Sequence, residues 1–203
     1  MRSHSDCLTA LRATLLREAR LLTAVAESLD DTASEAVDAL LRTKGHILAG
    51  GAGTSSAVAA RFAHLLACCG APAVFIHPAD SLHGSSGAVR SGDTLVLISK
   101  GGKTAEVNQF ARIAKSRGAT VIVLTEDGSS ELGEIADISV TVRAGDNDPF
   151  GMVATGSSLA NAAVGDAICE AILERSGYTL AEFAATHPGG AVGCKIRQQG
   201  LDS

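Results

Sequence analysis

The chain has 203 residues, of which 46% are hydrophobic but only 3% aromatic, and its formal net charge is −5 at pH 7. A chain of this length forms one domain, or one domain with a short arm, and can bury a substantial core of alanine, valine, leucine and isoleucine. The negative charge, with no block of lysine or arginine, argues against nucleic acid or an anionic membrane as the main partner.

The N-terminal stretch is predicted to form a long helix with one apolar stripe. Leucines recur every seven residues from residue 8 to residue 29, which is the spacing of one helix face. Asp30 then offers an N-cap for a second helix that ends near Leu41. We therefore assign residues 1–43 to an N-terminal helical arm that packs on the domain or on a partner subunit, and residues 44–203 to the main domain.

Five short apolar segments follow, and each is predicted to be a strand. They are continuous runs rather than alternating ones, which indicates strands that are covered on both faces. Helical segments lie between them, most clearly at residues 104–117, so the order favours repeated β-α units in a parallel sheet. A last helix is predicted for residues 153–175. The predicted strands are residues 46–49, 73–76, 94–99, 120–125 and 138–142.

The turn at residues 50–56 has the sequence Gly-Gly-Ala-Gly-Thr-Ser-Ser and joins the first predicted strand to a helix. Backbone N–H groups and the positive end of the helix dipole converge at such a turn, and the glycines let an anion come close. The third glycine of the dinucleotide fingerprint and the G-K-[ST] ending of a P-loop are both absent. Taken alone, this turn indicates either a phosphate seat or merely a turn that makes room for the chain.

A second turn of similar composition follows the third predicted strand. It has the sequence Ser-Lys-Gly-Gly-Lys-Thr at residues 99–104, and Thr125 follows the fourth strand. Open parallel sheets bind ligands beyond the carboxyl ends of their strands, at a switch point in strand order. Because two such turns occur, we expect them to hold a phosphate group together.

Five segments of the chain match the motifs of one known family. They are residues 51–55, 77–84, 99–106, 156–167 and 186–193. Two of them contain the His-Pro pairs His77-Pro78 and His187-Pro188, which are specific to one branch of that family. The chain thereby resembles the sugar isomerase (SIS) domain, which binds phosphosugars, and its closest likeness is to the SIS domain of arabinose-5-phosphate isomerases.

The resemblance implies an α/β fold of three layers, with a doubly wound five-stranded parallel sheet and helices on both faces. It implies a homodimer or homotetramer whose site lies near subunit contacts. It also implies an isomerase that interconverts an aldose phosphate and a ketose phosphate through an enediol, with no metal or organic cofactor. The alternative is a non-catalytic sugar-phosphate sensor or regulatory module. A different phosphosugar reaction, such as epimerisation or ether cleavage, is a third interpretation.

The family's site residues can be carried over to two groups of positions. Glu106, His83 and His187 match acid–base positions. The positions expected to hold the substrate or its phosphate are Gly53, Thr54, Ser55, Ser99, Lys100, Lys103, Thr104, Ser157 and Ser158. Each acid–base candidate also has a plainer interpretation: a capping carboxylate for Glu106, a polar loop residue for His83, and for His187 a histidine that holds the tail in place.

The chain departs from the family pattern at several of these positions. The family has a lysine at the position of Thr54, so Lys100 or Lys103 would have to supply the charge that the first turn lacks. The family also has a serine at Gly101 and a glutamate at Lys103. Another family glutamate, before the final helix, has no clear counterpart in the acidic turn at residues 145–149. The substrate is therefore expected to differ from arabinose 5-phosphate, or the catalytic set to be rearranged.

Other features of the sequence favour no further chemistry. His77 and His83 match no zinc spacing, and no G-x-S-x-G nucleophile elbow occurs. The five cysteines are odd in number and have no C-x-x-C spacing, which favours reduced thiols. With no apolar leader and no long apolar run, we expect a cytoplasmic protein without a membrane partner. We also expect the paired regulatory CBS modules of longer relatives to be absent.

Overall fold

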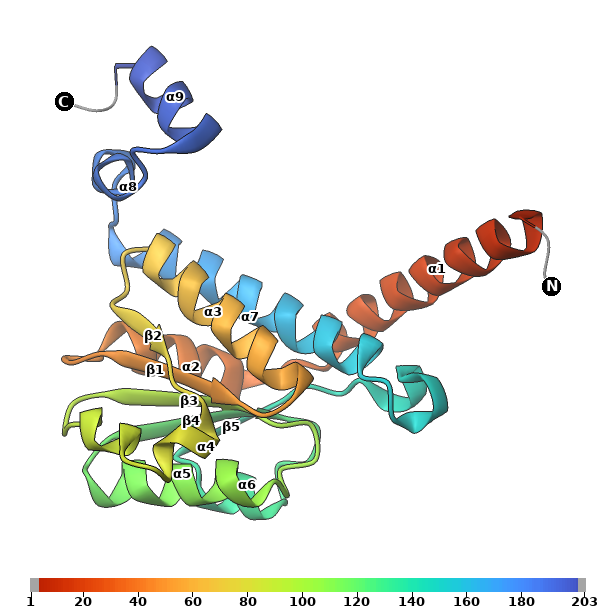
Figure 1. Cartoon of the computed structure of the whole chain (residues 1–203), viewed down its shortest axis with the longest axis horizontal. Coiled ribbons are helices and arrows are strands. Elements are labelled where there is room, and N and C mark those ends of the chain that lie inside the picture. Colours follow the sequence, from red (N-terminus) through yellow and green to blue (C-terminus); the bar gives the residue numbers. More distant parts are fainter. Residues whose placement is uncertain (1–3, 201–203) are drawn as a thin grey trace.

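The computed structural model describes residues 4–200 and contains a five-stranded parallel sheet between two layers of helices (Figure 1). The strands are β1 Ile47–Gly51, β2 Ala73–Phe75, β3 Thr94–Ile98, β4 Thr120–Thr125 and β5 Ile138–Thr141. All neighbouring strands are parallel, in the order β2-β1-β3-β4-β5. The predicted doubly wound α/β sheet is thus confirmed.

The strand order reverses at β1. This strand pairs with β2 on one side and with β3 on the other, so the chain crosses back over β1 after β2. Gly51 lies opposite Ile98, and the carboxyl ends of β1 and β3 are therefore side by side. The two glycine- and hydroxyl-rich turns leave the same edge of the sheet at its switch point, which is where open α/β sheets bind ligands.

The long helices agree with the sequence prediction, and several short ones were not predicted. The long helices are α1 His4–Ser28, α2 Asp31–Leu41, α3 Thr54–Cys68, α5 Ala105–Ser116 and α7 Thr155–Ser176. The unpredicted helices are α4 Pro78–Ser81, α6 Glu131–Ile135, α8 Leu180–Thr186 and α9 Gly190–Gln198, with 3₁₀ turns η1 Ser85–Ala88, η2 Gly145–Asn147 and η3 Pro149–Gly151. Segments this short do not display a helical period of apolar residues.

Alternate residues of each strand face opposite helix layers, as the pleat of a strand requires. In β3, Val96 and Ile98 belong to a core that they share with α2, α3 and α7. Leu95 and Leu97 belong to a second core, which they share with α5 and α6. Because both faces of the sheet are covered, the strands read as continuous apolar runs in the sequence.

The N-terminal half of α1 stands clear of the rest of the chain (Figure 1). Leu21 and Val25, in its second half, are buried in the core, whereas Leu8, Leu11 and Leu15 are 48%, 58% and 65% exposed. The next helix, α2, is part of the core layer beside α7. The predicted apolar stripe is therefore covered over only part of its length within one chain.

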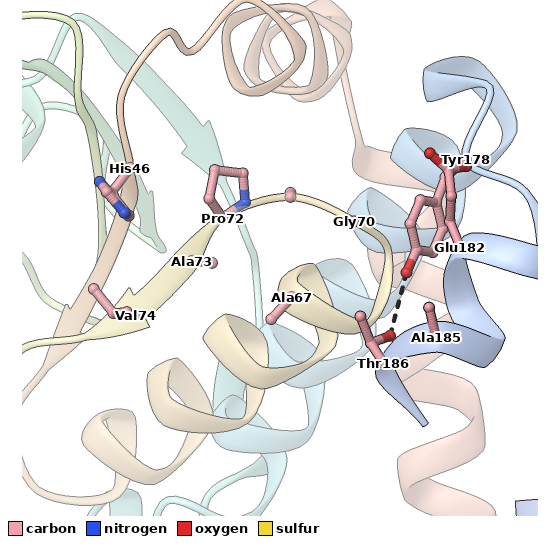
Figure 2. Close-up of a pocket in the computed structure, with 11 residues that line it drawn as sticks. His46, Ala67, Gly70, Pro72, Ala73, Val74, Tyr178, Glu182, Ala185 and Thr186 are labelled. Atoms are coloured by element: carbon pink, nitrogen blue, oxygen red, sulfur yellow. Dashed lines mark hydrogen bonds between the residues drawn. The ribbon is translucent and has the colours of Figure 1, made fainter. Parts of the chain in front are cut away.

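At its other end the chain leaves α7 and continues as α8, beside the amino edge of the sheet, and then as α9, which stands away from the sheet (Figure 1, Figure 2). An open groove there is lined by Ala67 of α3, Pro72 before β2, and Tyr178 and Thr186 of the tail. The Tyr178 ring covers Gly70, where a Cβ atom would come within 2.5 Å of Tyr178 Cδ2. This tail thus lies at the edge of the sheet opposite to the two turns.

Candidate functional site

Two helices begin without a side-chain cap at the carboxyl edge of the sheet. Gly53 precedes α3, directly after β1, and Thr104 precedes α5, after β3, and neither residue makes a side-chain capping hydrogen bond. Four other helices are capped by side chains, namely those of Asp30, His77, Ser130 and Thr179. The N-cap residues of α7 and α9 also make no such bond, but at the start of α7 the Ser157 N–H donates to Asp148. Since the first N–H groups of a helix need partners and favour anions, the ends of α3 and α5 form two adjacent anion seats.

The first loop keeps its donors open to a ligand. Gly53 has a positive φ of 57°, and a Cβ atom there would meet nothing within 4 Å. A Cβ atom on Gly51 would come within 2.7 Å of the Ser55 carbonyl oxygen, so glycine lets this loop close tightly over β1. The Ser56 hydroxyl donates to the Gly53 carbonyl at 2.6 Å. No such bond engages the hydroxyls of Thr54 and Ser55 among the described residues, and both stay available.

The second loop, residues 99–104, is held in place by hydrogen bonds to β4 and α6. Ser99, the first residue after β3, is 6% exposed, and its N–H donates to the Leu124 carbonyl at 3.1 Å. The Thr125 hydroxyl donates to the Lys100 carbonyl at 3.0 Å, and the Leu132 N–H donates to the Gly102 carbonyl at 3.1 Å. Thr125 therefore holds the backbone of the second loop and is not itself open to a ligand. Ser99 lies at the carboxyl edge, where β1 and β3 end side by side.

Glu106 and His83 both lie at this edge. Glu106 is in the first turn of α5, is exposed, and makes no hydrogen bond or ion pair through its carboxylate within residues 4–200. His83 is exposed and follows α4, which begins after the carboxyl end of β2. The carboxylate can thus accept a proton from a ligand held at the two helix ends, with the imidazole on a neighbouring loop.

His187, in contrast, lies in the tail at the opposite edge of the sheet. It ends α8, stacks on Phe183 with the ring centroids 3.8 Å apart, and places Nδ1 3.0 Å from the Phe183 carbonyl oxygen. The 22 residues of α7 carry the chain about 33 Å from the carboxyl edge. Within one chain the length of α7 therefore separates His187 from Glu106 and His83, and its role as an acid–base residue stays a prediction.

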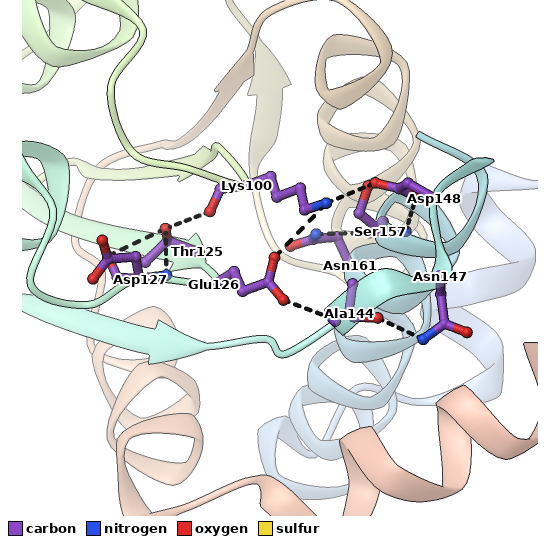
Figure 3. A network of polar contacts seen from close by, with 10 residues as sticks. Lys100, Thr125, Glu126, Asp127, Ala144, Asn147, Asp148, Ser157 and Asn161 are labelled. Atoms are coloured by element: carbon purple, nitrogen blue, oxygen red, sulfur yellow. Dashed lines mark hydrogen bonds and ion pairs between the residues drawn. The ribbon is translucent and has the colours of Figure 1, made fainter. Parts of the chain in front are cut away.

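Lys100 connects the second loop to the loop that precedes α7 (Figure 3). Its Nζ atom lies 2.9 Å from Asp148 Oδ2 and 3.8 Å from Glu126 Oε2. Ser157, in the first turn of α7, donates its N–H to Asp148 Oδ1 at 2.9 Å and its hydroxyl to Asp148 Oδ2 at 2.7 Å. The carboxylate of Asp148 therefore occupies the anion seat at the start of α7.

These contacts shift the pKa values of both charged groups. Burial by itself raises the pKa of Asp148, but the hydrogen bonds from Ser157 and Lys100 outweigh it and lower that pKa below its ordinary value of 3.8. The hydrogen bond to Asp148 raises the pKa of Lys100, against the opposing effect of burial. Both groups are thus charged at neutral pH, as an ion pair requires.

Ser157 and Ser158 are engaged by the protein itself. Ser157 is 3% exposed and bound to Asp148, and the Ser158 hydroxyl donates to the Thr155 carbonyl at 3.2 Å. They support the start of α7, and direct contact with a substrate remains a prediction. Sequence reasoning gave no role to Asp148, because its only signal was an acidic turn, and its partner Lys100 lies 48 residues away in sequence.

Lys103 lies on the opposite side of the same loop. Its neighbour Gly102 packs against Ser130 and Leu132 of α6, and Lys103 itself is exposed and lowers the pKa of Asp127 by its charge, after the hydrogen bonds from Ser129. The two lysines that could replace a cation of the first turn therefore have different partners: Lys100 pairs with Asp148 before α7, whereas the charge of Lys103 acts on Asp127 after β4.

Other features of the described residues add no further centre. No group of three or more His, Cys, Asp and Glu residues within 4–200 is arranged to hold a metal ion. All five cysteines are unpaired, and burial raises the pKa of Cys169 to about 12, which makes that thiol unreactive. None of the helices in residues 4–200 is both long and apolar enough to span a membrane.

The chain is similar in sequence and structure to proteins that are named as sugar-phosphate isomerases. The family model described as SIS domain matches residues 40–171. The arabinose 5-phosphate isomerase KdsD of Pseudomonas aeruginosa is 30% identical over 197 residues, which cover 97% of this chain and 60% of that protein. The chain spans about three fifths of the length of the curated relatives it matches.

Two solved structures are similar over their whole length. A crystal structure from Listeria monocytogenes, described provisionally as a sugar-phosphate isomerase, has a TM-score of 0.89 and 32% identity and covers 93% of this chain and 100% of that one. An Escherichia coli CFT073 protein in complex with arabinose 5-phosphate has a TM-score of 0.88 and 28% identity and covers 92% of this chain and 100% of that one.

Proposed function

The chain belongs to the SIS domain family, and on this premise we propose that it is a phosphosugar isomerase that interconverts an aldose phosphate and a ketose phosphate through an enediol. The observation that carries the proposal is the pair of uncapped helix ends after β1 and β3, with Ser99 directly after β3. Similarity to proteins named arabinose 5-phosphate isomerases supports the reaction class.

In this proposal the phosphate sits at the N-termini of α3 and α5, where backbone N–H groups and the hydroxyls of Ser55 and Ser99 donate to its oxygens. The carbon chain then extends toward Glu106, the base that removes a proton from the carbon beside the carbonyl. The imidazole of His83 or His187 moves protons between the carbonyl oxygen of the substrate and the neighbouring hydroxyl oxygen. The proposed reaction therefore needs fixed hydrogen-bond donors for the phosphate, one carboxylate as the base and one imidazole as the proton shuttle.

The proposal is tested by following sugar phosphates in deuterated water by NMR. An isomerase exchanges a carbon-bound proton for deuterium and converts aldose into ketose. The second candidate function, a sugar-phosphate sensor, is favoured by Thr54, which leaves the first loop without the lysine of the family pattern. A sensor would bind one member of a panel of pentose and hexose phosphates in a calorimeter and show no exchange, and that result would overturn the isomerase.

The catalytic imidazole of His187 can act only if another copy of the chain presents it. His187 lies at the amino edge of its own sheet, while Glu106 lies at the carboxyl edge. The exposed leucines of α1 offer an apolar surface for such an assembly. We therefore propose a homo-oligomer, dimer or tetramer, in which the tail of one copy reaches the carboxyl edge of its neighbour.

Mixing two inactive variants tests this arrangement. Glu106→Gln and His187→Asn each remove one group, and subunit exchange between them is expected to restore activity because some sites then combine an intact Glu106 with an intact His187 from different copies. The assay is aldose-ketose conversion after the two variants have been unfolded and refolded together. The control mixes two differently tagged preparations of Glu106→Gln. Activity that stays at the level of this control would show that His187 does not act across subunits.

Ser99→Ala is expected to weaken binding of the sugar phosphate by about 1.5 to 3 kcal/mol, because one charge-assisted hydrogen bond to the phosphate is lost. The dissociation constant, measured by calorimetry, is the readout. Ser116→Ala is the matched control, because this exposed hydroxyl at the far end of α5 only donates to the Ile113 carbonyl. Equal affinities of the two variants would remove Ser99 from the phosphate seat.

A further inference from the structure

Lys100 lies on the face of the sheet where α3 begins. Lys100 follows β3 in a turn, and its Nζ atom lies 2.9 Å from Asp148, which is bound to Ser157 at the start of α7. The helices α7 and α3 share the core on one face of the sheet. The side chain of Lys100 is therefore on the same face as the first loop, where the family pattern has its lysine and this chain has Thr54.

The ammonium group of Lys100 is held firmly but stays accessible. It donates to Asp148 at 2.9 Å, and the Glu126 carboxylate lies farther away, at 3.8 Å (Figure 3). An ammonium group has three donors, so this contact leaves two of them. The side chain of Lys100 is 37% exposed, whereas that of Asp148 is 3% exposed. An anion arriving at the edge of the sheet can thus reach the cation of the pair.

Asp148 cannot move freely, because it is bound to α7 as well as to Lys100. Its two oxygens accept hydrogen bonds from the N–H and the hydroxyl of Ser157, and the positive end of the α7 dipole stabilises its charge. Glu126, the second carboxylate, accepts a hydrogen bond from the Gly145 N–H at 2.7 Å and so anchors the beginning of the same loop. The position of the ammonium group is therefore set by a buried carboxylate that is hydrogen-bonded to the start of α7.

We propose that Asp148 is a positioning residue that holds the Lys100 ammonium group beside the start of α3, where Lys100 is the cation that meets the bound sugar phosphate. This inference rests on the proposed binding of a sugar phosphate at the helix ends. It assigns the missing charge to Lys100 rather than to Lys103, because Lys100 is bound to the loop before α7, which packs beside α3, whereas the charge of Lys103 acts on Asp127. Asp148 touches no substrate and acts through Lys100.

A double-mutant cycle on the full chain tests the proposal. Affinities for the sugar phosphate selected from a panel are measured by calorimetry for wild type, Lys100→Met, Asp148→Asn and the variant with both changes. Lys100→Met is expected to weaken binding about 10- to 100-fold and Asp148→Asn about 5- to 10-fold. The variant with both changes is expected to bind no more weakly than Lys100→Met alone, because Asp148 has no effect once the ammonium group is gone.

Three controls separate positioning from a loss of folding. Asp146→Asn removes an exposed carboxylate from the same loop and is expected to change affinity by less than about twofold. Lys115→Met removes an equal charge at the far end of α5, where Lys115 pairs with Asp137 at 2.8 Å, and is expected to change affinity as little. Lys100→Arg keeps the charge and is expected to recover most of the affinity. Thermal melts of every variant show that each is folded at the temperature of the titration.

The possible results of the cycle separate a failure of this inference from a failure of the proposed function. If wild type binds the ligand and Lys100→Met binds it equally well, the role of Lys100 is overturned while the proposed function stands. If the losses from Lys100→Met and Asp148→Asn add up in the combined variant, Asp148 does not act through Lys100. If wild type binds no member of the panel, the proposed function fails, and this inference fails with it.

Discussion

Glu106→Gln is expected to lower the rate of aldose-ketose conversion about 10²- to 10⁴-fold, the usual contribution of a general base. Glutamine has nearly the same shape as glutamate but cannot take a proton from carbon. Because Glu106 is exposed in the first turn of α5 and makes no ion pair among the described residues, the change should leave folding and binding nearly intact. Rates are measured by NMR in deuterated water, and dissociation constants by calorimetry.

Glu134→Gln serves as the matched control for this change. Glu134 is also an exposed carboxylate in the first turn of a helix, α6, so the same substitution there removes the same charge without touching the candidate site. Full activity is expected. If Glu106→Gln were as active as Glu134→Gln, the base would have to lie elsewhere, and a role for Glu106 as an ordinary helix-end carboxylate would explain its position.

Phe110→Ala is expected to destabilise the fold by about 3 to 5 kcal/mol, the usual range for removing a buried phenylalanine. Phe110 is fully buried in the core under α5, one turn after Glu106, and its ring lies 3.6 Å from the place where Gly50 would carry a Cβ atom. The loss combines the transfer free energy of the ring with the cost of the cavity left between α5 and the sheet. The free energy of unfolding in urea is the measurement.

Phe150→Ala makes the same chemical change at a side chain that is 88% exposed. Its effect on the free energy of unfolding is expected to stay within about 0.5 kcal/mol, as for most surface positions. Similar values for the two variants would mean that α5 does not pack on the sheet as described. The position of Glu106 relative to the two helix ends would then also be wrong.

Much of the fold could be predicted from the sequence because both faces of the sheet are covered. Continuous runs such as residues 94–99 and 120–125 can hardly be anything but buried strands, and the turns between them show where helices begin. The strand order could not be read from local pattern, since pairing of β1 with β3 joins residues 47 apart in sequence, such as Ile47 and Thr94. The position of α8 at the amino edge could not be predicted either, because a helix of seven residues shows no helical period of apolar residues in the sequence.

The candidate site was predictable only in part, for related reasons. The glycines and hydroxyls of the two turns revealed the helix ends after β1 and β3, because capping chemistry is local in sequence. Asp148 remained without a role, since only the folded chain brings it to Lys100 and Ser157. His187 carried a recognisable motif, but its distance from Glu106 depends on the length and direction of α7.

The most direct measurement is a crystal structure of the protein with a bound sugar phosphate. The account predicts the phosphorus atom at the N-termini of α3 and α5, with its oxygens within hydrogen-bonding distance of the Ser55 N–H and the Ser99 hydroxyl. Phosphate found instead at the amino edge, in the groove beside Pro72 and Thr186, would contradict it.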